Sequence, residues 1–178
     1  MPTRTQPKTP RATPDAPATR AVKVGVAAVI VNGQGRVLFG VRRGPKAKGG
    51  GRTAVPGGGM EFGETVQQAV EREVREETGL EVKAMAVSQV HPELFFVNHV
   101  CGDIHYVTIF VECRVVGGKL ENREPTKCVG WDWFTLQQLA ALLSPEAVAA
   151  WQRGETHEDL CWIPLPQLSH YREHLGLS

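Results

Sequence analysis

The sequence has few of the residues that mark metal-stabilised or disulfide-bonded proteins. It holds four cysteines and no C-x-x-C pair, so a structural zinc site is not expected. The cysteines are widely scattered, at Cys101, Cys113, Cys128 and Cys161. This scatter predicts buried, reduced thiols in a cytosolic-type protein. The alternative is a disulfide, for which Cys113 and Cys128 are the first candidates.

Long apolar runs are also absent. No stretch approaches the roughly 18 apolar residues of a membrane-spanning helix, and the N-terminus lacks the apolar core of a secretory signal. We therefore expect a cytoplasmic protein that does not act on a membrane. Residues 1–20 hold five prolines and five threonines, a composition that predicts a disordered tail. An organelle transit peptide is the alternative, although its prolines would break the amphipathic helix of such peptides.

A strong net charge is missing as well. The formal net charge is +1; residues 1–20 contribute +3 from four basic and one acidic side chain, which leaves −2 for the remainder. Residues 21–178 therefore lack the excess of positive charge that is typical of proteins that bind duplex nucleic acid. The expected partner is a small molecule.

What is present suits one globular domain, because 178 residues can bury a core and the composition is 42% hydrophobic. Apolar runs predict strands over 22–31, 36–43, 82–91, 104–116 and 128–134. The turn signal NGQG at 32–35 predicts that the first two strands form a hairpin. Amphipathic helices are expected over 64–78 and 134–143.

This order of elements lacks a regular β-α-β alternation, which favours an α/β fold with a mixed sheet over a doubly wound parallel sheet. The predicted organisation is a tail over 1–20, a domain over 21–143 and a C-terminal extension over 144–178 that packs on the domain. A short helix is expected near the end of that extension.

The helix expected over 64–78 concentrates acidic residues at its C-terminal end. The stretch VEREVREETGL, residues 70–80, carries Glu71, Glu73, Glu76 and Glu77, where the helix dipole disfavours negative charge. Glu73 and Glu77 lie on one helix face, since they are four residues apart. A divalent cation would stabilise such a cluster, and carboxylate oxygens suit Mg²⁺ or Mn²⁺. The alternative is a solvated acidic face with Glu–Arg pairs.

A glycine-rich segment, PGGGMEFGE, precedes this helix at residues 56–64. Glycines let the backbone approach a ligand closely, so their carbonyls could bind metal and their N–H groups could meet phosphate oxygens. The segment is not a phosphate-cradling P-loop, because no Gly-Lys-Ser/Thr follows.

Together the two segments form a spaced pattern, which reads Gly58-x5-Glu64-x7-Arg72-Glu73-Val74-x-Glu76-Glu77-x-Gly79-Leu80. It resembles the Nudix box, G-x5-E-x7-R-E-U-x-E-E-x-G-U with U aliphatic, and every fixed position matches. The resemblance implies a Nudix-type α/β/α sandwich with a mixed β-sheet. It also implies a hydrolase of a nucleoside diphosphate linked to another moiety, working with Mg²⁺ or Mn²⁺. Cleavage of a nucleoside triphosphate would release a nucleoside monophosphate and pyrophosphate.

The same resemblance assigns roles residue by residue. The implied metal ligands are the carbonyl of Gly57 and the carboxylates of Glu73, Glu76 and Glu77. Arg72 would pair with Glu64 and hold Glu73 in place. The general base is Glu73 or Glu76, and the resemblance leaves that choice open.

Two further segments narrow the resemblance. HYVTIFVECR at 105–114 and EPTKCVGWDWF at 124–134 are similar to the Nudix subgroup named for the second MutT homologue. Its members resemble enzymes that clear modified nucleoside triphosphates, oxidised purines among them. The candidate substrate-binding residues are Arg42, Gly58, Tyr106, Thr108 and Trp133. Trp131 shares a strand face with Trp133, and core packing is expected for at least one of the two.

Other functions stay open at this point. Some plant relatives in the subgroup act on prenyl diphosphates, so a geranyl diphosphate hydrolase is one alternative. A Nudix-fold protein that senses a nucleotide without cleaving it is another, but it would be expected to lose box glutamates, and all are present. An RNA-cap hydrolase would need a basic groove, which is not evident. Many relatives form homodimers, and the sequence leaves that possibility open.

Overall fold

The structure is a computed structural model, and it describes residues 21–44, 51–85, 96–101, 104–141 and 144–152. Expectations for the tail over 1–20, for residues 86–91 and for a helix near the end of the extension lie outside the described residues.

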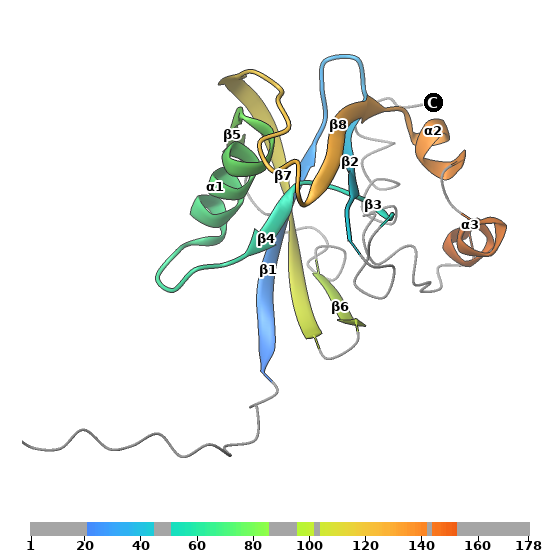
Figure 1. Cartoon of the computed structure of the whole chain (residues 1–178), viewed down its shortest axis with the longest axis horizontal. Helices are drawn as coiled ribbons and strands as arrows, with labels where there is room; N and C mark the ends of the chain where they lie inside the picture. Colours follow the sequence, from blue (N-terminus) through green and yellow to red (C-terminus); the bar gives the residue numbers. More distant parts are fainter. Residues whose placement is uncertain (1–20, 45–50, 86–95, 102–103, 142–143, 153–178) are drawn as a thin grey trace, which may run out of the picture.

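Two sheets form the body of the protein (Figure 1). The larger one is mixed and has the strand order β4-β1-β7-β5, with β6 also paired to β7. Its strands are β1 (Val22–Ile30), β4 (Gly57–Gly59), β5 (Leu80–Ala84), β6 (Phe96–Cys101) and β7 (Ile104–Gly118). The smaller sheet is antiparallel and consists of β3 (Thr53–Ala54), β2 (Val37–Arg42) and β8 (Cys128–Phe134). The predicted α/β fold with a mixed sheet is confirmed, and strands dominate it.

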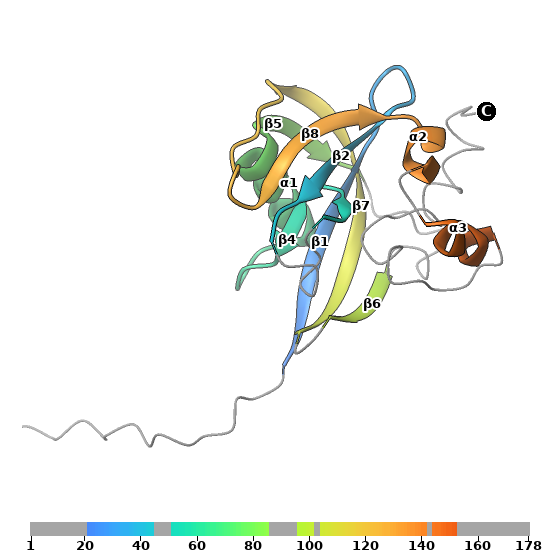
Figure 2. The same ribbon diagram turned by 45° about the vertical axis from the view of Figure 1, so that its right-hand side comes forward.

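Helices lie on both sides of these sheets. Helix α1 (Val66–Thr78) packs against the larger sheet, with its closest association at β5, β4 and β1. Helices α2 (Leu136–Ala141) and α3 (Pro145–Gln152) follow β8 and lie on the opposite side of the molecule from α1 (Figures 1 and 2). Within the described part of the chain, every helix is too short or too polar to cross a membrane.

The predicted hairpin of the first two strands is wrong. The turn forms as expected, because the side chain of Asn32 accepts hydrogen bonds from the N–H groups of Gln34 and Arg36. Beyond a single bridge between Val31 and Val37, however, the two strands separate. Strand β1 is buried from Gly25 to Ile30 and pairs with β7 in parallel, whereas β2 joins the other sheet. The turn at Asn32 reverses the direction of the chain, but β1 and β2 each pair with strands that are distant in the sequence.

Four further elements differ from the prediction. Strand β4 is a short all-glycine strand, and β6 had no strong apolar pattern to reveal it. Strand β7 continues to Gly118, two residues past the predicted end at 116. Helix α3 begins at Pro145, where the sequence analysis predicted no helix; proline is favoured in a first helical turn.

Helix α1 follows the prediction closely. Thr65 and Gln68 form a reciprocal capping box at its start, and Gly79 ends it in the left-handed conformation with φ of 72°. Val70 and Val74 are fully buried against the larger sheet, and each contributes roughly 1.5–3 kcal/mol through burial. This anchoring fixes which helix face carries the acidic residues.

Cys113 and Cys128 are buried free thiols, as predicted, so the candidate disulfide between them does not form. Burial raises the pKa of Cys113 to about 12, which keeps that thiol protonated.

Candidate active site

The glycine strand β4 lies directly against the acidic end of α1. The N–H of Gly57 donates a hydrogen bond to Oε2 of Glu77 at 2.9 Å. A Cβ atom on Gly58 would lie only 2.6 Å from the carboxylate of Glu73, so a larger residue there would displace that carboxylate. Because β4 pairs with β1 through Gly25, Val26 and Ala27, this contact is set by the larger sheet. The two segments of the spaced pattern are therefore brought together.

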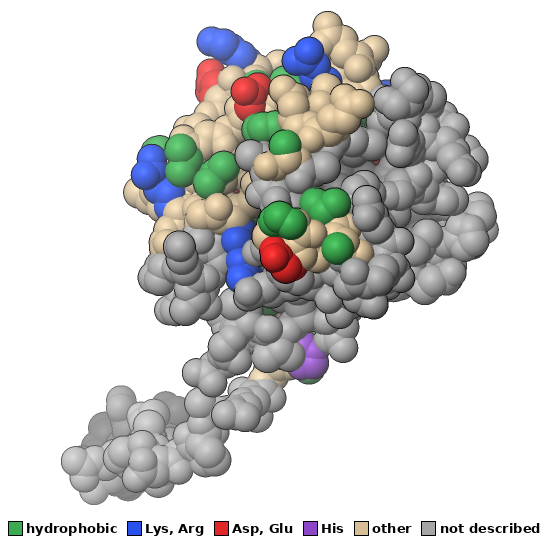
Figure 3. All heavy atoms as spheres, turned by 90° about the vertical axis from the view of Figure 1, so that its right-hand side faces the viewer, with side chains coloured by type: hydrophobic (Ala, Val, Ile, Leu, Met, Phe, Trp, Pro, Cys, Tyr) green, Lys and Arg blue, Asp and Glu red, His purple; other side chains and the backbone are tan. Residues whose placement is uncertain are grey.

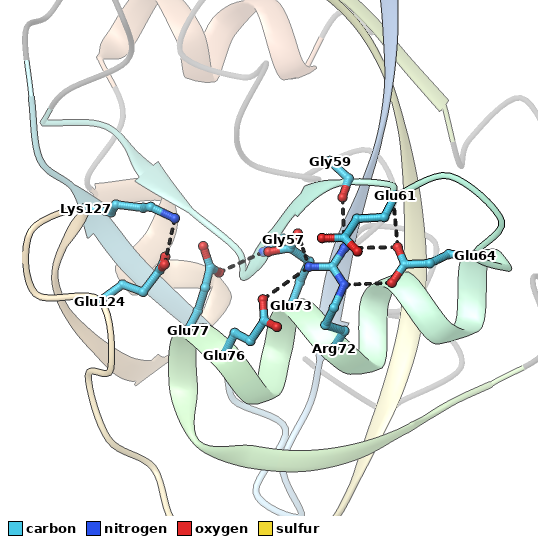
Figure 4. A network of polar contacts seen from close by, with 10 residues as sticks. All are labelled: Gly57, Gly59, Glu61, Glu64, Arg72, Glu73, Glu76, Glu77, Glu124 and Lys127. Atoms are coloured by element: carbon cyan, nitrogen blue, oxygen red, sulfur yellow. Dashed lines mark hydrogen bonds and ion pairs between the residues drawn. The ribbon is translucent and has the colours of Figure 1, made fainter. Parts of the chain in front are cut away.

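Arg72 connects the box glutamates to one another (Figure 4). Its Nε and Nη2 donate to the two carboxylate oxygens of Glu64 at 2.7 and 3.0 Å. Its Nη1 donates to Glu73 at 2.8 Å and to Glu76 at 3.2 Å, and Nη2 also reaches the carbonyl of Gly59 at 3.0 Å. The hydrogen bonds from Arg72 lower the pKa of Glu64 to about 2. Arg72 thus has the geometry of a residue that orients the acidic cluster.

The pKa of Glu77 is shifted in the opposite direction from that of Glu64. Burial raises the pKa of Glu77 to about 7, although the hydrogen bond from Gly57 acts against the rise. The negative charges of Glu73 and Glu124 raise this pKa further, and the positive charge of Arg42 lowers it. Burial also raises the pKa of Glu73, against the charge of Arg72. Burial therefore disfavours the charged form of both carboxylates.

A second acidic group approaches from outside the box. Glu124 lies in the loop before β8, and its Oε1 accepts a hydrogen bond from Lys127 Nζ at 2.6 Å. Its Oε2 is buried with no hydrogen-bond partner among the described residues. In Figure 4, Glu77 stands between the Arg72 network and this pair. Sequence reasoning missed Glu124; its segment was noted only for the subgroup resemblance.

The donor set fits a divalent cation. Oxygen donors come from one helix face and from a glycine strand, the local charge is strongly negative, and one buried carboxylate oxygen lacks a partner. As the side chains stand, no three carboxylate, histidine or cysteine groups of the described residues meet at one point. Glu76 is half exposed and bonded only to Arg72 among the contacts described above, so its side chain is free to reorient toward a cation.

The predicted substrate-binding residues occupy different surroundings. Arg42 is half-buried at the end of β2, close enough to act on the charge of Glu77. Tyr106 lies beside Gly25, with Lys23 Nζ at 5.9 Å from its ring centroid. Thr108 pairs with Gly25 across the strands, and alternation puts it on the face of Tyr106. Trp133 packs against the core cluster under α1, and Trp131 does so too.

A family model for the NUDIX domain matches residues 21–157. This chain belongs to the Nudix family. The match runs past residue 143 and includes α3.

Individual Nudix proteins are similar to parts of the chain. An ADP-ribose pyrophosphatase of Methanocaldococcus jannaschii is 36% identical over 91 residues, which cover 50% of this chain and 49% of that protein. A nudix hydrolase of Caenorhabditis elegans is 30% identical over 91 residues, with 51% of this chain and 22% of that protein covered. The chain therefore spans about half or less of the length of these curated relatives.

Solved structures of Nudix proteins share the fold. The MutT NUDIX hydrolase from Burkholderia pseudomallei is 27% identical with a TM-score of 0.54, and the match covers 68% of this chain and 96% of that one. The MutT protein from Methanosarcina mazei Go1 is 22% identical with a TM-score of 0.58, and covers 76% of this chain and 94% of its own. Nudix hydrolases generally use divalent metals, in agreement with the donor set of the site.

Proposed function

We propose that this Nudix protein is a Mg²⁺-dependent pyrophosphohydrolase that cleaves nucleoside triphosphates to a nucleoside monophosphate and pyrophosphate. Mn²⁺ would replace Mg²⁺, because both are hard cations that accept carboxylate oxygens. The observation that carries the proposal is the Arg72 network next to the Glu77–Gly57 hydrogen bond, which gathers the box glutamates at one end of α1. The residues that would hold the cation are Gly57, through its carbonyl, with Glu73, Glu76 and Glu77.

Each part of the site has a task in this reaction. When bound, a divalent cation supplies positive charge at the phosphates and lowers the pKa of water. Glu73 or Glu76 would accept the proton of the attacking water as its oxygen bonds to phosphorus and the P–O–P bridge breaks. Arg72 keeps Glu73 directed at the reaction site.

A second candidate substrate is ADP-ribose. It is favoured by the relative from Methanocaldococcus jannaschii, which is named an ADP-ribose pyrophosphatase and is 36% identical over half of this chain. The bond cleaved would again be a phosphoric anhydride, so the same residues would serve. The choice between the two would rest on the residues proposed to bind the rest of the substrate, Tyr106 and Thr108 among them, and not on the acidic cluster.

A small substrate also agrees with the surface. On the face shown in Figure 3, the described Lys and Arg side chains lie in separate groups and do not form one stripe. A duplex nucleic acid would be favoured by a continuous basic stripe. We therefore keep the prediction of a small-molecule partner.

The test is metal-dependent turnover of a substrate panel. Ordinary and oxidised nucleoside triphosphates, ADP-ribose and geranyl diphosphate would be incubated with Mg²⁺ and the protein, and products would be separated by chromatography. Glu77→Gln serves as the blank. Cleavage of triphosphates to monophosphates supports the leading proposal, and preferred cleavage of ADP-ribose supports the second. Turnover of geranyl diphosphate alone, or nucleotide binding without turnover, would contradict both.

A further inference from the structure

The C-terminal end of α1 is closed by the segment that leads into β8. The carbonyl of Glu77 accepts two hydrogen bonds, from the N–H of Arg123 at 3.1 Å and from Nε1 of Trp131 at 3.1 Å. The carbonyl of Thr78 accepts from the N–H of Glu121 at 2.8 Å. Carbonyls at the end of a helix have no partners within the helix, and they form the negative pole of its dipole. Donors from a distant segment therefore offset this pole where the acidic residues gather.

We propose that Trp131 is a positioning residue for the metal site, acting on Glu77 through its main-chain carbonyl. The same residue presents its carboxylate to Gly57 and its carbonyl to Trp131. The indole of Trp131 thus connects β8 to the last turn of α1 through this hydrogen bond. Trp131 contacts neither the metal nor the substrate in this role. The inference rests on the proposed function, since it concerns the affinity of that site for its cation.

Gly40 on β2 leaves space for the indole of Trp131. It pairs with Trp131 across β2 and β8, and a Cβ atom at position 40 would lie 2.7 Å from Cε3 of Trp131. The same atom would lie 2.7 Å from Sγ of Cys128 and 2.8 Å from the carbonyl of Gly130. Backbone and a buried thiol cannot move aside easily, so an alanine at Gly40 would displace the indole. The smaller sheet in this way helps to define the acidic end of α1.

The hydrogen bond from Trp131 affects the position of the Glu77 carboxylate relative to that of Glu73. The carboxylate of Glu77 accepts a hydrogen bond from the N–H of Gly57 at 2.9 Å. A small rotation of the last turn would move this carboxylate relative to Glu73, which Arg72 holds separately. Loss of the indole donor therefore separates two ligands that a cation needs at the same time.

The test uses Trp131→Phe, which keeps an aromatic ring but removes the N–H donor. Trp133→Phe is the matched control, because Trp133 lies on the same strand and packs against the same core cluster. Mn²⁺ binding would be measured by electron paramagnetic resonance without any substrate. We expect the Kd of Trp131→Phe to rise by roughly threefold to tenfold, as the loss of one hydrogen bond implies. Trp133→Phe is expected to stay within about twofold of the wild type.

Two further readouts separate positioning from general destabilisation. In ¹⁵N spectra, the indole N–H signal that disappears in Trp131→Phe should shift when Mg²⁺ is added to the wild type. At saturating Mg²⁺, kcat of Trp131→Phe should recover toward the wild-type value, whereas a damaged fold would not be restored. Should Trp131→Phe fail to fold, Gly40→Ala displaces the indole without removing it, and the same rise in Kd is expected.

Equal Mn²⁺ affinity in Trp131→Phe and the wild type, or equal losses in Trp131→Phe and Trp133→Phe, would overturn the inference and leave the proposed function intact. Absence of Mn²⁺ and Mg²⁺ binding by the wild type would instead overturn the proposed function, and the inference with it.

Discussion

The carboxylate of Glu77 accepts a hydrogen bond from the N–H of Gly57 at 2.9 Å, although the two residues are 20 positions apart. This contact joins the acidic end of α1 to the glycine strand β4. It does not fully stabilise the charge of Glu77, because burial raises the pKa of that carboxyl to about 7. The charged form of Glu77 therefore destabilises the folded, metal-free protein.

We expect the metal-free protein to lose stability as the pH rises from about 4.5 to about 7. The folded state binds the Glu77 proton more tightly than the unfolded chain, so raising the pH through this window favours unfolding. This loss in the free energy of unfolding is absent below pH 4.5 and reaches about 3 kcal/mol above pH 7. The measurement is the free energy of unfolding in urea at several pH values in the presence of EDTA.

Glu77→Gln should remove this part of the pH dependence and should make the metal-free protein more stable than the wild type at pH 8. Glu81→Gln is the control, because Glu81 is an exposed carboxylate in β5 and its removal should leave the profile unchanged. A Glu77→Gln profile that falls as steeply as that of the wild type would contradict the assignment.

The Arg72 network predicts that lysine cannot replace Arg72. Its guanidinium serves Glu64 through two parallel hydrogen bonds and Glu73 through a third, and an ammonium lacks this planar fork. We expect Arg72→Lys to lower kcat/KM by roughly 10- to 100-fold. Arg75→Lys, on the exposed side of the same helix, should retain wild-type activity. Steady-state kinetics on the best substrate of the panel would measure both.

Wild-type activity in Arg72→Lys would mean that charge alone is sufficient at this position. It would then be wrong to treat the fork geometry as the feature that orients Glu73.

The box and its helix could be predicted from the sequence because their determinants are local. Thr65 and Gly79 define the ends of α1, and apolar residues at three- and four-residue spacing define its buried face. The spacing of Gly58, Arg72 and the glutamates then predicted the site, although the proximity of Gly57 to Glu77 depends on the pairing of β4 with β1.

The rest could not be predicted because it depends on distant segments. The separation of β1 and β2 follows from their pairing with β7 and β8, which no local turn signal encodes. Glu124 and Trp131 reach α1 only through the course of the chain after β7, and their spacing from the box carries no periodic signal. The motif around them was visible, but it indicated a subgroup and not a contact with Glu77.

Glu124 is expected to strengthen cation binding from outside the box. Its charge acts on Glu77, and its buried Oε2 has no hydrogen-bond partner among the described residues. Glu124→Gln should weaken Mn²⁺ binding by roughly tenfold, since a negative charge near the cation is lost. Glu121→Gln is the matched control in the same loop, because Glu121 is exposed and lies 3.6 Å from Arg123. Calorimetric titration of Mn²⁺ into both variants would measure the difference, and equal affinities would exclude this role for Glu124.

The two neighbouring glycines Gly58 and Gly59 provide the sharpest steric test of the site. A Cβ atom on Gly58 would lie 2.6 Å from the carboxylate of Glu73, whereas a Cβ atom on Gly59 would meet nothing within 4 Å. Neither glycine has a positive φ, so alanine strains the backbone at neither position. Gly58→Ala should therefore displace the Glu73 carboxylate and lower kcat/KM by at least about tenfold.

Gly59→Ala should keep wild-type activity and stability, since its methyl group points into open space. Measuring kcat/KM together with the thermal midpoint separates the two effects, because a general loss of folding would lower both quantities. If Gly58→Ala and Gly59→Ala have the same activity, Glu73 tolerates displacement by the size of a methyl group. The carboxylate that touches Gly58 would then not be the one that must be held in place, and Glu76 would be left as the candidate base.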